Sequence, residues 1–234
     1  MKLTYFIALA TVIVLTSVFS TAMAQEASPY QAEYQTTPGY KDFRFSFGGG
    51  YAYRLGNMEK TGDAVLDDMN KKLRHGFTVD ADAQYFFKES WGLGLNANFS
   101  SASTSGNNVT IPVIDQAVNY KEMQSIVYVG PSFVGRNESD KFLLITHVGV
   151  GPLFFNADMN YSGQRITGNK TTVGVNAGIA GEYKVNNKTG VGLKLSYVMG
   201  SIDNLNVEGQ NEKFKEKISV SNLMATVFIS FRSW

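Results

Sequence analysis

Charged side chains recur at alternate positions along this chain of 234 residues, which contains no cysteine. Asp80 and Asp82 stand two residues apart, as do Glu182 and Lys184. Because successive side chains of a strand point to opposite faces, this spacing puts each pair on one face. Such a row of acids and bases can line an ion-selective pore, or it can fill a closed interior with ion pairs. We expect one shared interior to hold Arg44, Asp80, Asp82, Glu122, His147, Glu182, Lys184, Lys194 and Arg232.

Residues for catalysis or metal binding are scarce. The chain has two histidines, His75 and His147, and without cysteine it lacks the thiolates of many zinc sites. His147 stands mid-strand in ITHVG, where we expect a hydrogen-bonding rather than a catalytic role. The acidic residues between 59 and 68 match no EF-hand spacing and are interpreted as a solvated loop. We therefore predict no enzymatic activity, no metal site and no cofactor.

The N-terminus predicts a secretory signal peptide over residues 1–24. Lys2 is its basic region, residues 5–19 are its apolar region, and Ala24 ends a small-x-small cleavage pattern. A short polar periplasmic tail is expected over 25–41. The absence of cysteine excludes a lipoprotein anchor and a disulfide framework. With 21 Lys+Arg against 20 Asp+Glu, the chain lacks the basic surplus of nucleic-acid binders, and no nucleic-acid partner is expected.

Period-2 alternation of apolar and polar residues dominates from residue 42 to the end, residue 234, and predicts one β-barrel domain. One short helix is predicted over 63–73. The predicted strands are 42–55, 74–87, 91–102, 119–135, 142–155, 171–185, 190–203 and 217–232. Short connections alternate with the long connections 56–73, 103–118, 156–170 and 204–216. This alternation is typical of transmembrane barrels, and each strand has at least the ~9–11 residues that a tilted strand needs to cross a bilayer.

The short connections also predict pairing. Pairing Phe87 with Trp91, and Val185 with Val191, keeps the apolar residues of each hairpin on one side. The second register would place Glu182 opposite Lys194, close enough for an ion pair. Pro131 and Pro152 each remove a ladder donor, so we expect local bulges beside them.

The residues of the two faces indicate which face meets lipid. The polar face is rich in glycine, which weakens strands on a solvated exterior but relieves crowding inside a narrow barrel. This disfavours a soluble periplasmic barrel and predicts an apolar exterior. Two aromatic girdles are expected at the membrane surfaces. The short-turn girdle is Phe43, Phe87, Trp91, Phe142, Tyr183 and Phe231, and the long-loop girdle is Tyr53, Phe77, Phe99, Phe154 and Tyr197.

The strand number, the loop rhythm and the last strand, SNLMATVFISFRSW, resemble the small OmpA/OmpX-type outer-membrane barrel family. The resemblance implies an all-β, eight-stranded antiparallel up-and-down transmembrane β-barrel in the outer membrane of a Gram-negative bacterium, in contact with lipid and lipopolysaccharide. It also implies recognition of the last strand by the barrel-assembly machinery. The alternating residues from Leu223 to Phe231 fit that role, whereas Trp234 lies out of parity. Some relatives modify lipids, but neither histidine lies in the local patterns of those enzymes.

These patterns predict a structural or surface-interaction role in envelope integrity, adhesion or resistance. Four long extracellular loops would contact a surface ligand or host partner. An eight-stranded interior is barely wide enough for its own side chains, which favours a side-chain-filled lumen over an open pore. The alternative is a narrow OmpW-like channel for small or hydrophobic solutes.

Overall fold

The computed structural model describes residues 42–56, 64–111, 116–161, 163–207 and 209–233. The predicted signal peptide, the periplasmic tail and Trp234 lie outside these ranges. Within them, none of the helices has the length and apolar character needed to cross a membrane.

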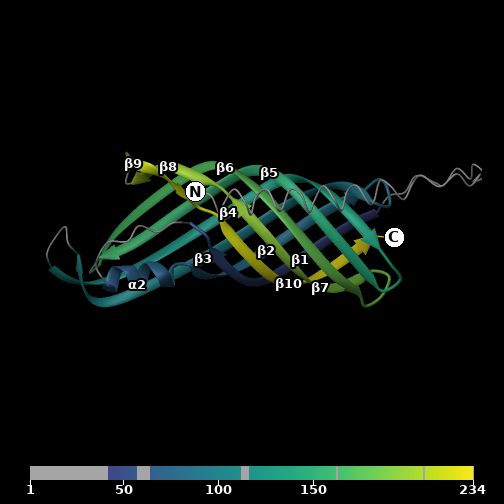
Figure 1. The fold of residues 1–234 in the computed structure, drawn as a ribbon, viewed down its shortest axis with the longest axis horizontal. Helices are drawn as coiled ribbons and strands as arrows, with labels where there is room; N and C mark the ends of the chain where they lie inside the picture. The colour runs from purple at the N-terminus through teal and green to yellow at the C-terminus, as the bar shows by residue number, and fades with distance from the viewer. Residues whose placement is uncertain (1–41, 57–63, 112–115, 162, 208, 234) are drawn as a thin grey trace, which may run out of the picture.

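Eight antiparallel strands form a closed ring, so the predicted up-and-down barrel is confirmed (Figure 1). The ring closes through the pairing of β5 with β6 and of β1 with β10. Its strands are β1 (Asp42–Arg54), β2 (His75–Phe86), β3 (Trp91–Ile111), β4 (Gln116–Glu138), β5 (Phe142–Tyr161), β6 (Gln164–Lys184), β7 (Thr189–Met199) and β10 (Asn222–Ser233). Two further strands, β8 (Ser201–Val207) and β9 (Gln210–Ser219), make a hairpin that pairs with β6.

The predicted helix over 63–73 corresponds to α2 (Ala64–Lys72). Asp67 lies in its first turn and Lys71 and Lys72 in its last, which suits the helix dipole. Met69 and Leu73 are buried, and the helix contacts β3. Above Ser101, β3 has no partner on the β2 side among the described residues, so the helix lies beside an otherwise open edge.

Three of the four predicted long loops are mainly strand. The β3–β4 ladder continues to Ile111 opposite Gln116, and the β5–β6 ladder to Tyr161 opposite Gln164. The segment predicted as the loop 204–216 belongs to the β8–β9 hairpin. Gly163 and Gly209 have φ angles of 97° and 87°, a left-handed conformation that glycine adopts without strain and that lets these hairpins reverse.

The two predicted registers have different outcomes. Phe86 pairs with Gly92, which confirms the register that places Phe87 opposite Trp91. The pairing of Val185 with Val191 is wrong, because Val191 lies opposite Tyr183. The side-chain oxygen of Asn186 accepts hydrogen bonds from the backbone amides of Lys188 and Thr189, both at 2.8 Å, and this tight turn reverses the chain earlier than expected.

The expected bulges at Pro131 and Pro152 are also absent from the pairing. Both prolines lie in register with β3 and β6 respectively, and β4 and β5 keep one register on either side of the prolines. Gly130 and Gly151 face each other there, and a Cβ on Gly151 would lie 2.6 Å from the Gly130 Cα. The missing side chains let the strands approach without an inserted residue.

The polarity of the two faces inverts along the tall strands. The last outward-facing apolar residues include Phe99, Phe154 and Val173. Beyond them most exposed outward positions are polar, as at Ser103 and Asn156, with Met123 opposite Ser103 as an exposed apolar exception. The inward face near the short turns combines charged residues with a small apolar cluster that includes Phe86 and Phe228, whereas apolar residues dominate it near the hairpin tips. The apolar belt therefore ends near Phe99 and Phe154, and the wall above it resembles a water-soluble barrel with an apolar core.

Candidate functional site: the side chains inside the barrel

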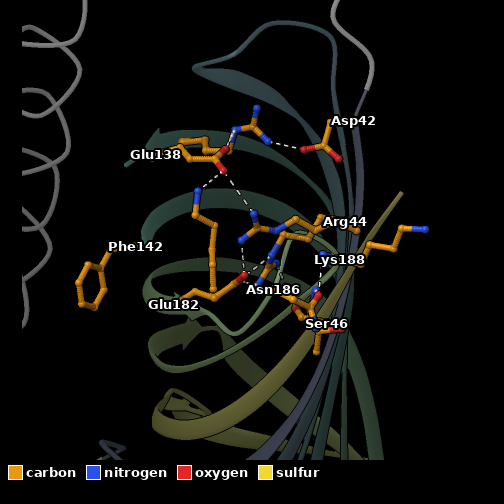
Figure 2. Close-up of polar contacts among 12 residues, drawn as sticks. Asp42, Arg44, Ser46, Glu138, Phe142, Glu182, Asn186 and Lys188 are labelled. Carbon is orange, nitrogen blue, oxygen red and sulfur yellow. Dashed lines mark hydrogen bonds and ion pairs between the residues drawn. The ribbon is translucent and has the colours of Figure 1, made fainter. Parts of the chain in front are cut away.

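The lower ion cluster lies inside the barrel at the short-turn end and is centred on Glu182 (Figure 2). Arg44 donates two hydrogen bonds to the Glu182 carboxylate, from Nε at 3.0 Å and from Nη2 at 2.7 Å. Arg232 Nη2 donates to the other carboxylate oxygen. The Glu182 side chain is fully buried, so one carboxylate compensates two buried guanidinium groups.

Glu138 extends the lower ion cluster towards the short turns. Its carboxylate accepts a hydrogen bond from Lys184 at 2.8 Å and one from Arg232 at 3.3 Å. Arg136 lies 3.7 Å from the same carboxylate, donates to Asp42 and stacks its guanidinium over the Phe86 ring at 4.3 Å. The lower ion cluster is hereafter Asp42, Arg44, Arg136, Glu138, Glu182, Lys184 and Arg232.

The middle ion cluster contains Lys194, Asp80 and Asp82. Lys194 Nζ lies 2.8 Å from a carboxylate oxygen of each aspartate. Ser46 joins the two clusters, since its hydroxyl accepts from Arg44 at 3.2 Å and donates to Asp82 at 3.2 Å. Lys194 lies opposite Ala180 and Glu182 opposite Gly192, so the predicted Glu182–Lys194 ion pair does not form. The two-residue shift of β7 gives each of these charges a different partner.

An amide layer surrounds His147. Its Nε2 lies 2.6 Å from Asn176 Oδ1, and Asn176 Nδ2 donates to Asn98 Oδ1 at 3.2 Å. His147 is 2 % exposed and its bonded partner is an amide, as expected for a hydrogen-bonded interior histidine. His75 instead lies at the outside of the barrel against the rings of Tyr51 and Tyr53.

The formal charges of the two ion clusters cancel. The lower ion cluster has four cations and three carboxylates, an excess of one positive charge, and the middle ion cluster has one cation and two carboxylates, an excess of one negative charge. Ser46 lies between them. Such balance suits a filled interior, because an unpaired charge would be costly to bury.

An apolar plug fills the interior above the amide layer. Its buried members are Ala52, Ile126, Tyr128, Leu153, Phe155, Ala157, Val198, Ile202, Leu205, Val220 and Met224. Arg54 packs its guanidinium over the Phe155 ring at 5.6 Å. Glu122 is also at this level, where it accepts from Tyr120 and Gln124, so it belongs to neither ion cluster. A pocket beside Arg54 has a volume of about 10 Å³, room for about one water molecule.

The residue pattern did not single out three members of the lower ion cluster: Asp42, Arg136 and Glu138. Arg136 and Glu138 continue the inward parity of β4, but the predicted strand ended at residue 135. Asp42 shares the parity of Arg44 at the first position of β1. Following the inward alternation three residues past the predicted strand end at 135 would have found Arg136 and Glu138, and Asp42 already stood at the first position of the predicted strand 42–55.

The predicted girdle aromatics lie on the outside of the barrel. Phe142 is 61 % exposed and contacts Tyr183 with ring centroids 5.6 Å apart. At the short-turn end Phe87 contacts Trp91 at 4.3 Å, while at the other end Phe77 contacts Phe99 at 5.8 Å. Their position at the depth of the lipid headgroups stays a prediction.

The site has the chemistry of a stabilised interior. Among residues 42–233, outside the gaps given above, no group of three or more His, Cys, Asp or Glu is arranged to hold a metal ion. The described cations of the ion clusters each contact a carboxylate inside the barrel. Such contacts cross-link strands that lie far apart in the sequence.

Three solved structures are similar to this chain. A major outer membrane protein from Thermus thermophilus is similar with a TM-score of 0.50 at 11% identity, over 83% of this chain and 100% of the other. Ail of Yersinia pestis, the attachment invasion locus protein, is similar with a TM-score of 0.47 at 14% identity, over 82% and 99%. Neisserial surface protein A has a TM-score of 0.44 at 12% identity, over 81% and 96%.

A search of curated proteins found no match to this sequence. The family model for the outer membrane protein beta-barrel domain matches residues 10–225, which is most of the chain. That match agrees with the closed ring of eight antiparallel strands. The chain therefore belongs to the outer membrane protein beta-barrel domain family, whose setting is the cell outer membrane.

Proposed function

We propose that this protein is a non-conducting, non-enzymatic surface protein of the outer membrane, which acts in envelope integrity, adhesion or resistance through its tall extracellular β-structure. The observation that carries the proposal is the filled interior. Two ion clusters, an amide layer and an apolar plug follow one another along the barrel. Solutes would have to break buried ion pairs and then separate packed apolar side chains, which makes the channel for small or hydrophobic solutes the second choice.

The length of four strands supports a role outside the membrane. β3, β4, β5 and β6 have 21, 23, 20 and 21 residues, whereas ~9–11 residues suffice to cross the hydrocarbon. The surplus of roughly ten residues per strand corresponds to about 33 Å of strand at about 3.3 Å per residue. Its outer face is polar at Ser103, Asn156 and Thr167. A rigid wall of this length presents a surface ligand or host partner with more surface than membrane anchoring requires.

Targeting and assembly complete the proposal. Residues 1–24 act as a signal peptide that is cleaved near Ala24, and residues 25–41 form a short periplasmic tail before the barrel domain 42–234. The barrel-assembly machinery recognises the last strand, whose outward residues include Leu223 and Phe231. The outer surface contacts membrane lipid and lipopolysaccharide.

Conductance tests the closed lumen. Purified protein in a planar bilayer is expected to show no steady conductance. Steady single-channel current that disappears when Gly178 is replaced by a larger residue would instead support the channel, since a Cβ at Gly178 would lie 2.5 Å from the His147 ring and fill the lumen there.

Shortening one hairpin tests the surface role. Asn156 lies opposite Asn169, so removing residues 157–168 and closing the strands with an Asn-Gly turn preserves the register below. Bacteria that carry this variant should lose retention on collagen and on cultured epithelial cells, while heat-modifiable gel migration shows a folded barrel. Equal retention of both forms would contradict a contact role for this hairpin.

A further inference from the structure

Arg54 is a buried cation without a carboxylate partner. It is 7 % exposed, and its Nε has no hydrogen-bond partner. Its guanidinium lies 5.6 Å from the centre of the Phe155 ring, a contact that stabilises the charge but leaves the Nε–H without an acceptor. Because burial of an uncompensated charge is costly, we expect a counter-charge beside Arg54.

Arg74 adds a second positive charge at the same place. The backbone amide of Arg54 donates to the Arg74 carbonyl at 2.8 Å, which continues the register of β1 with β2. The two arginines therefore lie opposite each other on neighbouring strands, with the inward parity of Ala52 and Gly76. Like charges in directly opposite positions of a sheet are destabilising unless something lies between them.

The other four arginines of the chain each contact a carboxylate. They are Arg44, Arg136, Arg165 and Arg232. Neither Arg54 nor Arg74 forms an ion pair with any of the residues that the structure describes. These two are thus the exceptions in a barrel that otherwise pairs its arginines.

Glu122 does not serve as the missing partner. It attracts Arg54 across the interior, but its carboxylate accepts hydrogen bonds from Tyr120 and Gln124 and forms no ion pair with either arginine. Two guanidinium groups and one carboxylate leave an excess of one positive charge at this level of the barrel.

A small pocket, hereafter the arginine pocket, connects the two guanidinium-bearing residues. Arg54 and Arg74 line it together with Ser100, Gln124 and Asn222, and its volume of about 10 Å³ has room for roughly one non-hydrogen atom. Asn222 Nδ2 donates to Ser100 Oγ at 2.6 Å, which leaves the Ser100 hydroxyl hydrogen and the second amide hydrogen of Asn222 for another acceptor. The lining is therefore rich in hydrogen-bond donors.

We propose that the arginine pocket binds one chloride ion between Arg54 and Arg74. A single negative charge cancels the excess of one positive charge, and a monatomic ion matches the volume of the pocket. A carboxylate group has three non-hydrogen atoms and a phosphate has five, so both are too large. Water matches the volume but would leave the opposed guanidinium groups uncompensated.

The ion would join several parts of the barrel. Its ligands come from β1, β3 and β10, through Arg54, Ser100 and Asn222, and from Arg74, which precedes β2. The buried Leu73, directly after α2, lines the same pocket. Bound chloride would thereby fasten the end of the helix to the ring of strands.

Equilibrium unfolding tests the proposal, because an ion that binds the folded state alone stabilises it by mass action. The full barrel is folded into phosphatidylcholine vesicles and unfolded with urea, in sodium chloride or in sodium gluconate of equal concentration. The urea midpoint should be higher in chloride, and above the dissociation constant each tenfold rise in chloride should raise the folding equilibrium constant about tenfold. Equal midpoints in the two salts would mean that the pocket holds water and would overturn the proposal.

An arginine variant separates the arginine pocket from a general effect of salt. Arg74→Gln removes one of the two opposed charges and should have the same midpoint in chloride and in gluconate. Arg165→Gln is the matched control, since the Arg165 side chain is 67 % exposed and belongs to another ion pair, and it should keep the chloride difference of the unchanged protein. A chloride difference that persists in Arg74→Gln would overturn the assignment of the site.

Bromide locates the ion directly. Crystals of the unchanged protein grown in sodium bromide should give an anomalous diffraction peak in the arginine pocket, in contact with both guanidinium groups, and Arg74→Gln crystals should lack it. An arginine pocket without this peak in the unchanged protein would overturn the proposal even if the midpoints differ. Heat-modifiable migration verifies folding, and Arg74→Met, which keeps the length of the side chain without its charge, replaces Arg74→Gln if that variant does not fold.

Discussion

Replacing Glu182 with Gln removes the charge that holds the lower ion cluster together while keeping the volume of the side chain. Arg44 would keep only neutral partners, Gln84 Oε1 at 3.0 Å and Ser46 Oγ at 3.2 Å, whereas Arg232 would keep Glu138 at 3.3 Å. Breaking a buried ion pair from one side costs about 3–5 kcal/mol. Because Arg232 retains a carboxylate, we expect the free energy of unfolding to fall by about 3 kcal/mol, at the lower end of this range.

The assay is equilibrium unfolding by guanidinium chloride of protein folded into vesicles, followed by tryptophan fluorescence. The midpoint should fall without a change in the slope, since the surface exposed on unfolding stays the same. Asp158→Asn is the control, because it breaks the ion pair with the exposed Arg165, where screening by solvent leaves little stabilisation to lose. A loss of about 1 kcal/mol or less in Glu182→Gln would mean that water screens this cluster as it screens a pore lining, and the filled-lumen reasoning would be refuted.

Three further perturbations test other levels of the barrel. Gly50→Ala should lower the free energy of unfolding by about 1–3 kcal/mol, because its Cβ would lie 2.7 Å from the Thr226 Cα. Gly49→Ala, on the other face of β1, should lower the free energy of unfolding by less than about 0.5 kcal/mol or raise it. Equal losses in the same unfolding assay would contradict the assigned faces. Leu153→Ala should lower the free energy of unfolding by about 2–5 kcal/mol, since Leu153 is fully buried in the apolar plug. The variant should still carry no steady current in a planar bilayer, because the ion clusters below remain intact. Steady current would show that the plug alone closes the lumen. The hydrogen bond from Arg165 lowers the pKa of Asp158 below the ordinary value of 3.8, so the contact should persist at neutral pH and be lost as the pH falls through that lowered pKa. NMR titration of the Asp158 carboxyl group checks this. An ordinary pKa that Arg165→Gln does not raise would contradict it.

Strand periodicity was sufficient to predict the eight-stranded ring, because alternating residues report which side chains share a face. It could not predict the partner of Glu182, since a two-residue shift of β7 leaves every side chain on its own face and is set instead by Asn186 in the turn. The tall upper strands were missed for a different reason. Their outward residues, such as Ser103 and Asn156, are polar, so a pattern that defines strands by an apolar outer face ends near Phe99.

The inversion of polarity explains how one barrel can be filled by two kinds of interior. Where lipid surrounds the wall, the apolar side chains are needed outside, and the remaining inward polar groups must bond to one another, as Arg44 and Glu182 do. Where water surrounds the wall, the outer face is solvated and the apolar residues turn inward, as Phe155 and Leu205 do. The interior of an eight-stranded barrel must be filled with side chains. The ion clusters fill it where lipid surrounds the wall, and the apolar plug fills it where water does. The closed lumen is linked to the height of the wall, because the tall strands β4 and β5 supply Tyr128, Leu153 and Phe155 to the apolar plug.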